Sequence, residues 1–69
     1  MPYYDDEMTD RAVRAFFNAC AREGVTPMQP SRYHTHRDGE RVTIANSHQT
    51  LAQYRVKRSG LKERVERVR

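Results

Sequence analysis

The sequence has little cysteine, little glycine and no long apolar run, and each shortage removes a class of protein. The single cysteine, Cys20, excludes an internal disulfide and fits a reducing compartment. The three glycines are isolated, so the chain contains no glycine-rich phosphate loop. No apolar run approaches the roughly 20 residues of a membrane span, and the acidic start is unlike the basic start of a signal peptide. We therefore expect a cytoplasmic protein that does not bind membranes.

The chain is short and strongly charged, which limits it to one small domain. Of its 69 residues, 36% are apolar and 32% are charged. A chain of this length buries roughly 60% of its unfolded surface, so its core is thin and its stability is marginal. Partner binding or self-association often completes such a core. We expect a single domain over residues 1–69, and a homodimer is compatible with this composition.

The charge is distributed unevenly along the chain. Residues 1–10 carry four acidic side chains and no lysine or arginine, whereas the other 59 residues carry 13 basic and five acidic side chains, a net charge of +8. Eleven of the 13 basic residues are arginine, whose planar group can bind phosphate or carboxylate through two hydrogen bonds. The basic body predicts an acidic partner, either nucleic acid or an acidic protein surface. The alternative is a solvated charged surface with no partner.

Residues 9–23 have the pattern of an amphipathic helix. Four apolar side chains recur at helical spacing and form one stripe: Val13, Phe16, Phe17 and Cys20. Thr9 is expected to cap the start of the helix, next to acids that suit the positive end of the helix dipole. Gly24 is expected to end the helix in a left-handed conformation, with Val25 folding back toward Cys20. The stripe predicts that Cys20 is a core residue rather than a reactive thiol.

A β-hairpin is predicted after an extended connector that contains two prolines. Residues 31–37 and 40–46 flank the dipeptide Asp38-Gly39, which is a favoured two-residue turn. This turn sets two pairs opposite each other on a single face, namely Thr35 with Val42 and Tyr33 with Ile44.

A third strand is predicted over residues 50–56, and the apolar pattern selects its loop. A two-residue turn at His48-Gln49 would set Ile44 opposite a polar glutamine. A three-residue loop over residues 47–49 instead sets Ile44 opposite Ala52 and Val42 opposite Tyr54. Only the three-residue loop keeps the apolar face continuous, so we predict that register.

The last nine residues fit two structures. The apolar positions Leu61, Val65 and Val68 lie on one helical stripe, so we predict a short helix. The alternative is a fourth strand, in which the preceding residues form a hairpin loop and Val56 pairs with Leu61. The predicted fold class is α+β: an N-terminal helix packed on a three-stranded antiparallel meander, followed by a short C-terminal helix or a fourth strand.

The predicted register leaves one face of the sheet polar, basic and open. On this face Arg41 is set opposite Arg55, an unfavourable placement of like charges unless a partner compensates it. The residues that we predict to bind a partner share a basic or imidazole side chain on this face or next to it: Arg32, His34, His36, Arg41, Arg55, Lys57 and Arg58.

Catalytic and metal chemistry have little support in the sequence. His34 and His36 alternate on a predicted strand, but no second pair of ligands exists to complete a zinc site, which usually needs three or four. The serines lack the motif context of a nucleophile with its base. We expect a protein that is not an enzyme and that uses neither a metal nor another cofactor.

One stretch resembles a pattern found in short phage and mobile-element accessory proteins. It covers residues 43–66, and its matching positions are Asn46, Leu51, Ala52, Tyr54, Arg55, Val56, Gly60 and Leu61. The turn departs from the pattern, because His48-Gln49 stands where Asn-Gly would be expected. The resemblance implies a phage-type origin and an inhibitor, of the anti-CRISPR or another anti-host type, that docks on a host protein or nucleoprotein complex. Direct binding to DNA or RNA is the alternative function.

Overall fold

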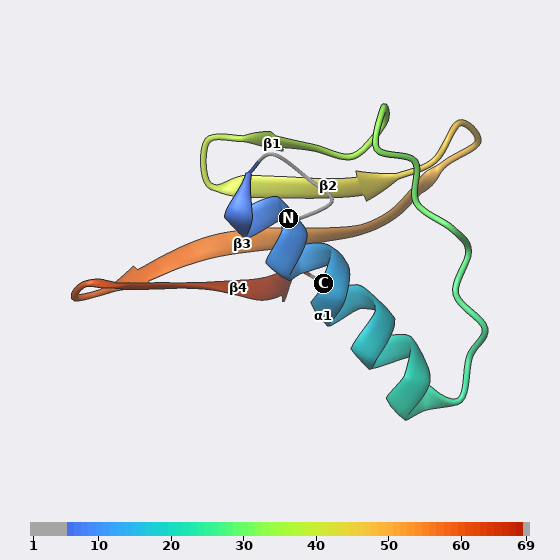
Figure 1. Cartoon of the computed structure of the whole chain (residues 1–69), viewed down its shortest axis with the longest axis horizontal. Helices are drawn as coiled ribbons and strands as arrows, with labels where there is room; N and C mark the ends of the chain where they lie inside the picture. Colours follow the sequence, from blue (N-terminus) through green and yellow to red (C-terminus); the bar gives the residue numbers. More distant parts are fainter. Residues whose placement is uncertain (1–5, 69) are drawn as a thin grey trace.

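The computed structural model describes residues 6–68, which form one helix, α1, packed on one face of a four-stranded antiparallel sheet (Figure 1). The strands lie in the order β1-β2-β3-β4, so each strand pairs with its neighbour in the chain. The α+β class is therefore confirmed. The short C-terminal helix is wrong, and the alternative of a fourth strand is confirmed.

Helix α1 spans Glu7–Glu23 and begins earlier than the sequence predicts. Asp6, not Thr9, caps it: the Asp6 carboxylate accepts hydrogen bonds from the Thr9 backbone N–H at 2.8 Å and from the Thr9 hydroxyl at 3.0 Å. An aspartate caps a helix as well as a threonine does, and an acid outside the first turn also suits the helix dipole. Gly24 ends the helix at φ 69°, and the Val25 N–H donates to the Cys20 carbonyl at 2.9 Å, as predicted.

The capping carboxylate gives a first testable prediction. Partial burial alone would raise the pKa of Asp6, but the hydrogen bonds from Thr9 and the ion pair with Arg37 together lower it below its ordinary 3.8. The stabilisation that follows from the lowered pKa of Asp6 is present above pH 3.8. It is lost as the pH falls through the lower pKa of Asp6 in the folded state. Asp6→Ala should reduce the free energy of unfolding by about 1 kcal/mol at neutral pH, measured by urea denaturation. The deficit should shrink in acid, and Asp38→Ala, at an exposed site, is the control; equal losses in both variants would contradict the capping role.

The first hairpin forms, but its register differs from the prediction by two residues. Strand β1 spans His36–Asp38 and β2 spans Arg41–Ala45, with Arg37 rather than Thr35 opposite Val42. The two turn residues are therefore Gly39 and Glu40, and Gly39 takes a φ of 61°. The predicted turn would require a positive φ at Asp38 as well as at Gly39, whereas the observed turn needs it only at the glycine.

A slip of two residues keeps the side chains of β1 on their predicted faces, but the strand begins only at His36. Thr35 remains buried at 6% exposure, and its hydroxyl donates to the Ala45 carbonyl at 3.2 Å. Tyr33 was predicted to lie on the core face opposite Ile44, and this is wrong. It sits in a turn before β1 and is 89% exposed.

The second hairpin confirms the register that the apolar pattern selected. Strand β3 spans Thr50–Ser59, with Ala52 opposite Ile44 and Tyr54 opposite Val42. The register shifts between Ile44 and Ala45, so Ala45 pairs with Thr50 and the loop is one residue longer than predicted. The Asn46 side chain stabilises this loop by accepting from the backbone N–H groups of the two residues before Thr50, at 2.8 and 2.9 Å.

The C-terminal segment is strand β4, which spans Lys62–Val68. In the pairing of β4 with β3, Val65 lies opposite Val56. The pairing of Val56 with Leu61, which we predicted for a fourth strand, is therefore wrong. The turn consists of Gly60 and Leu61, with Gly60 at a φ of 62° and Leu61 fully exposed. Backbone pairing with β3 and packing of Val65 against the core outweigh the weak helical stripe. Arg69 lies outside the described residues.

The core lies between α1 and the covered face of the sheet. Helix α1 supplies Met8, Ala12, Val13, Phe16 and Cys20, and the sheet supplies Val42, Ile44, Ala52, Tyr54 and Val56. Cys20 is thus a buried core residue, as predicted. Phe17 is only partly buried and packs against the edge of this cluster.

Candidate functional site

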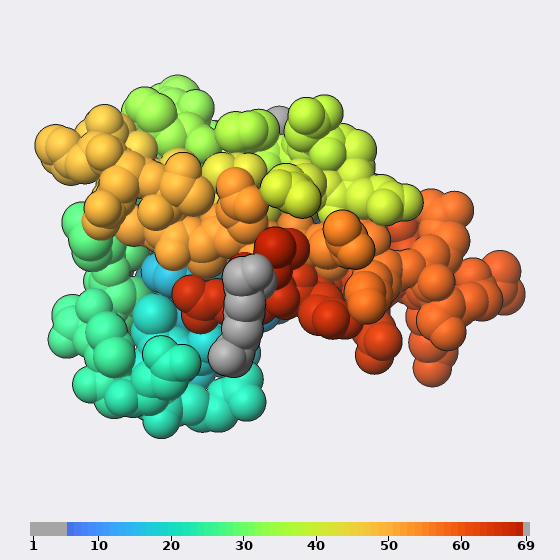
Figure 2. Space-filling view, turned by 180° about the vertical axis from the view of Figure 1, so that it is seen from behind, coloured from blue at the N-terminus to red at the C-terminus, as the bar shows by residue number. Residues whose placement is uncertain are grey.

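The sheet face that α1 does not cover is the candidate site, and we call it the open face. Because side chains alternate between the two faces of a strand, the register assigns its members from all four strands: His36, Asp38, Arg41, Thr43, Gln53, Arg55, Lys57, Ser59, Lys62, Arg64, Glu66 and Val68. Figure 2 looks at the molecule from this side, with the β3–β4 hairpin projecting from the body. Five members are cationic and two are acidic, so the face carries a net charge of +3.

Two arginines lie directly opposite each other at the centre of the open face. Arg41 on β2 pairs in register with Arg55 on β3, as the sequence predicts, and both are exposed. The Arg41 guanidinium donates to the Gln53 amide oxygen at 3.3 Å. Within residues 6–68, neither arginine forms an ion pair. Their guanidinium groups therefore have hydrogen-bonding capacity left for an external anion.

Acidic residues flank this arginine pair in the same cross-strand row. Asp38 pairs in register with Arg41, and Glu66 pairs with Arg55. Glu66 turns to Lys57, with which it forms an ion pair at 3.1 Å. The row is therefore acidic at both ends and doubly cationic in its centre. This pattern favours an anionic group that approaches the middle of the sheet.

A small hollow adjoins the arginine pair on the side of β4. It measures about 180 Å³ and is lined by Arg55, Lys57, Glu66, Arg67 and Val68. Its size suits a single carboxylate or phosphate group rather than an enclosed substrate.

Three of the predicted binding residues lie away from the open face. Arg32 and His34 belong to the turn that precedes β1, and Arg32 lines a hollow of about 570 Å³ between that turn and the start of α1. The alternation of side chains along β3 places Arg58 on the same face as Tyr54 and Val56, which is the covered face. Arg58 forms an ion pair with Glu63 at 3.3 Å. The structure therefore brings together only four of the seven predicted residues: His36, Arg41, Arg55 and Lys57.

The two histidines do not share a face. His34 Nδ1 lies 3.0 Å from the Ser31 hydroxyl within the turn, and His36 Nδ1 lies 3.2 Å from the His34 carbonyl. The Ser31 oxygen also accepts from the Tyr33 backbone N–H at 3.2 Å, which is a turn-stabilising arrangement. In the described part of the chain, no three histidine, cysteine or acidic side chains cluster in a way that could hold a metal ion.

The sequence interpretation missed two cations of the open face, Lys62 and Arg64. Both lie on β4, the segment that was predicted to be a helix. The signal for a strand here was an alternation of side chains: Lys62, Arg64 and Glu66 are polar, and the apolar Val65 lies between the last two. Because only one apolar residue marks the covered face of this strand, the alternation is weak.

Comparisons with known proteins add no relative. No protein-family model, no curated protein and no solved structure matches the chain. Among residues 6–68, no helix is long and apolar enough to span a membrane.

Proposed function

We propose that this is a non-catalytic binding protein whose open face docks on an acidic surface of a host protein or nucleoprotein complex. The observation that supports the proposal is the pair Arg41 and Arg55, set directly opposite each other and exposed. Like charges in opposed positions destabilise a sheet. Carboxylates or phosphates of a partner would relieve that repulsion and accept charge-assisted hydrogen bonds.

The proposed mode of action is inhibition by occupation of the host surface. Residues 43–66 resemble short phage and mobile-element proteins, among which inhibitors such as anti-CRISPR proteins are common, and this segment includes β3 with Arg55. The chemistry required is recognition alone, which suits a flat charged face with a hollow of about 180 Å³.

Direct binding to DNA or RNA is the second candidate, and Tyr33 favours it. Its ring is 89% exposed and lies between Arg32 and His34 in the chain. An exposed aromatic beside an arginine can stack on an unpaired base while the arginine contacts a phosphate. Tyr33→Ala would weaken this mode selectively.

The proposal predicts that the Arg41→Ala/Arg55→Ala double variant binds its host complex about a hundredfold more weakly or worse. Each arginine contributes hydrogen bonds to a charged group, at about 1.5–3 kcal/mol apiece. The fold should be retained, because both side chains are exposed. The measurement is co-purification of the tagged chain from host cells, followed by titration of the captured complex against each variant.

A matched control removes two arginines from the opposite side of the molecule. Arg14 and Arg22 are exposed on α1, and Arg14→Ala/Arg22→Ala lowers the net charge by the same amount. This variant should bind like the parent. Equal losses in both double variants would show that only net charge matters, and would contradict a site on the open face.

Salt dependence separates the two candidate functions. Direct binding to a labelled DNA or RNA oligonucleotide should weaken steeply with salt, in proportion to the number of phosphates contacted. Under the first proposal, the chain binds a purified host complex tightly and binds the oligonucleotide weakly. Tight, steeply salt-dependent oligonucleotide binding that requires Tyr33 would support the second candidate instead.

A further inference from the structure

Strand β4 forms one edge of the described sheet, and its outer side carries backbone groups without a strand partner. The Glu63 carbonyl accepts a hydrogen bond from Arg11 Nη1 at 2.8 Å, so it points away from β3. Alternate residues of a strand direct their backbone groups to the same side. Glu63, Val65 and Arg67 therefore present their backbone N–H and C=O groups outward. Such an edge is a template for pairing with another chain.

The charges along this edge are self-complementary in the antiparallel direction. Residues 63–67 read Glu-Arg-Val-Glu-Arg. When a second copy runs antiparallel with its Val65 opposite Val65, each acid meets an arginine: Glu63 faces Arg67, and Arg64 faces Glu66. We infer that two copies of this chain pair through β4 about a two-fold axis at Val65. This inference goes beyond the proposed function and does not depend on it.

The backbone and the charges select the same register. Outward-facing residues must pair with outward-facing residues, which places the two-fold axis at Val65 or at a neighbouring position, Arg64 or Glu66. An axis at Arg64 would set that arginine opposite itself, and an axis at Glu66 would set two glutamates together. Like charges in opposed positions are unfavourable. Of these three registers, only the one centred on Val65 avoids a like-charged pair.

Pairing would also give an acidic neighbour to two cations that form no ion pair among the described residues. Arg64 lies opposite Lys57 in the sheet, and neither Arg64 nor Arg67 forms an ion pair within residues 6–68. In the dimer, Arg64 faces Glu66 of the second copy. The Arg11 hydrogen bond can persist, because a carbonyl oxygen accepts two donors.

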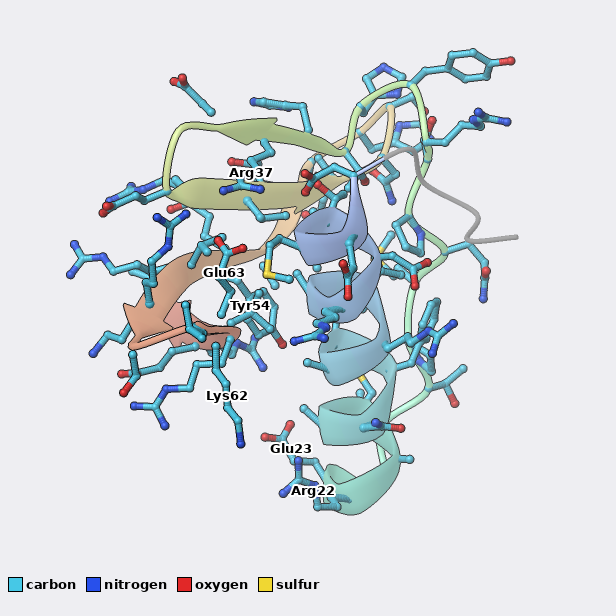
Figure 3. All side chains as sticks on the ribbon, turned by 60° about the vertical axis from the view of Figure 1, so that its left-hand side comes forward. Arg22, Glu23, Arg37, Tyr54, Lys62 and Glu63 are labelled. Carbon is cyan, nitrogen blue, oxygen red and sulfur yellow. The ribbon has the colours of Figure 1, made fainter. Side chains whose placement is uncertain are left out.

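The covered side of the edge has room for the second copy. A hollow of about 290 Å³ lies beside Arg67, between β4 and the last turns of α1, and is lined in part by Ala15, Ala19 and Tyr54. Figure 3 shows Arg22 and Glu23 at the end of α1, beyond the sheet, and Figure 1 shows the same overhang past β4. Glu63 of the second copy would enter this hollow and meet Arg67.

The test is sedimentation equilibrium of the full chain over a concentration series. The parent should show a reversible monomer–dimer equilibrium. Arg64→Glu creates two acid–acid pairs across the axis, and Glu66→Arg creates two arginine–arginine pairs. Each variant alone should dimerise about tenfold more weakly than the parent, because two attractive pairs become repulsive. An equimolar mixture of the two variants restores opposite charges at both positions and should form a heterodimer of about the parent's affinity.

Two controls separate pairing from folding. Arg64→Glu sets an acid opposite Lys57 within the single chain, so its fold should be unharmed, as checked by circular dichroism. Arg41→Glu makes the same charge change on the open face, away from β4, and should leave dimerisation unchanged. The inference is overturned if the parent stays monomeric at millimolar concentration, if Arg41→Glu weakens the dimer as much as Arg64→Glu does, or if the mixture associates no better than either variant alone.

Discussion

The Phe16→Ala variant is expected to be largely unfolded at room temperature. Phe16 is 5% exposed and lies where the helix stripe meets the covered face of the sheet. Truncation of a buried phenylalanine costs about 3–5 kcal/mol, from lost burial and from the cavity that remains. A single core in a chain of this size rarely supplies more than about 3–5 kcal/mol, so the loss takes most or all of its stability. Thermal and urea denaturation followed by circular dichroism measure the loss.

Phe17→Ala is the matched control for this prediction. The two rings lie 5.6 Å apart, but Phe17 is only partly buried at the edge of the core. Its truncation should cost about 1 kcal/mol, in proportion to the smaller area removed from water. If Phe17→Ala proved the more damaging variant, the helix would face the sheet through a different stripe.

The second large effect is expected at Ile44. This side chain is 0% exposed at the centre of β2, opposite Ala52. Ile44→Ala should reduce the free energy of unfolding by about 2–5 kcal/mol, measured by the same denaturation experiments. It should leave few molecules folded in moderate urea, where the parent remains native.

Leu61→Ala provides the control and also tests the C-terminal structure. Leu61 is fully exposed in the β3–β4 turn, so its truncation should change stability by less than about 0.5 kcal/mol. A C-terminal helix that packed through Leu61 would instead lose a core contact. A large loss in Leu61→Ala would therefore contradict the strand assignment of residues 62–68.

The strong apolar periodicities of the sequence were sufficient to predict the elements that bury the most surface. The stripe of Val13, Phe16, Phe17 and Cys20 predicted the helix and its inner face, although Phe17 lies at the edge of the core rather than within it. The alternation around Ile44 predicted the register of β2 with β3, and with it the opposition of Arg41 and Arg55 on the open face. These predictions are robust because a slip of one residue would move every apolar side chain into water.

The register of β1 could not be decided from the apolar pattern, because a slip of two residues returns each side chain to the same face. Backbone conformation chose the observed turn, in which Gly39 alone takes a positive φ. A separate turn, closed by hydrogen bonds from the His34 and Thr35 backbone N–H groups to the Ser31 carbonyl, sets Tyr33 in an exposed position and takes Arg32 and His34 off the sheet.

What the sequence by itself determined was the α+β class, the helix face, the β2–β3 register and the central arginine pair of the open face. Tertiary structure alone decided the C-terminal segment, and through it Lys62 and Arg64 as members of the open face. The physical reason is that residues 61–69 contain three apolar residues, so the segment gains little by itself from forming either a helix or a strand. Its backbone hydrogen bonds to the neighbouring strand β3, and the contact of Val65 with a core to which the distant helix α1 contributes, settled the outcome.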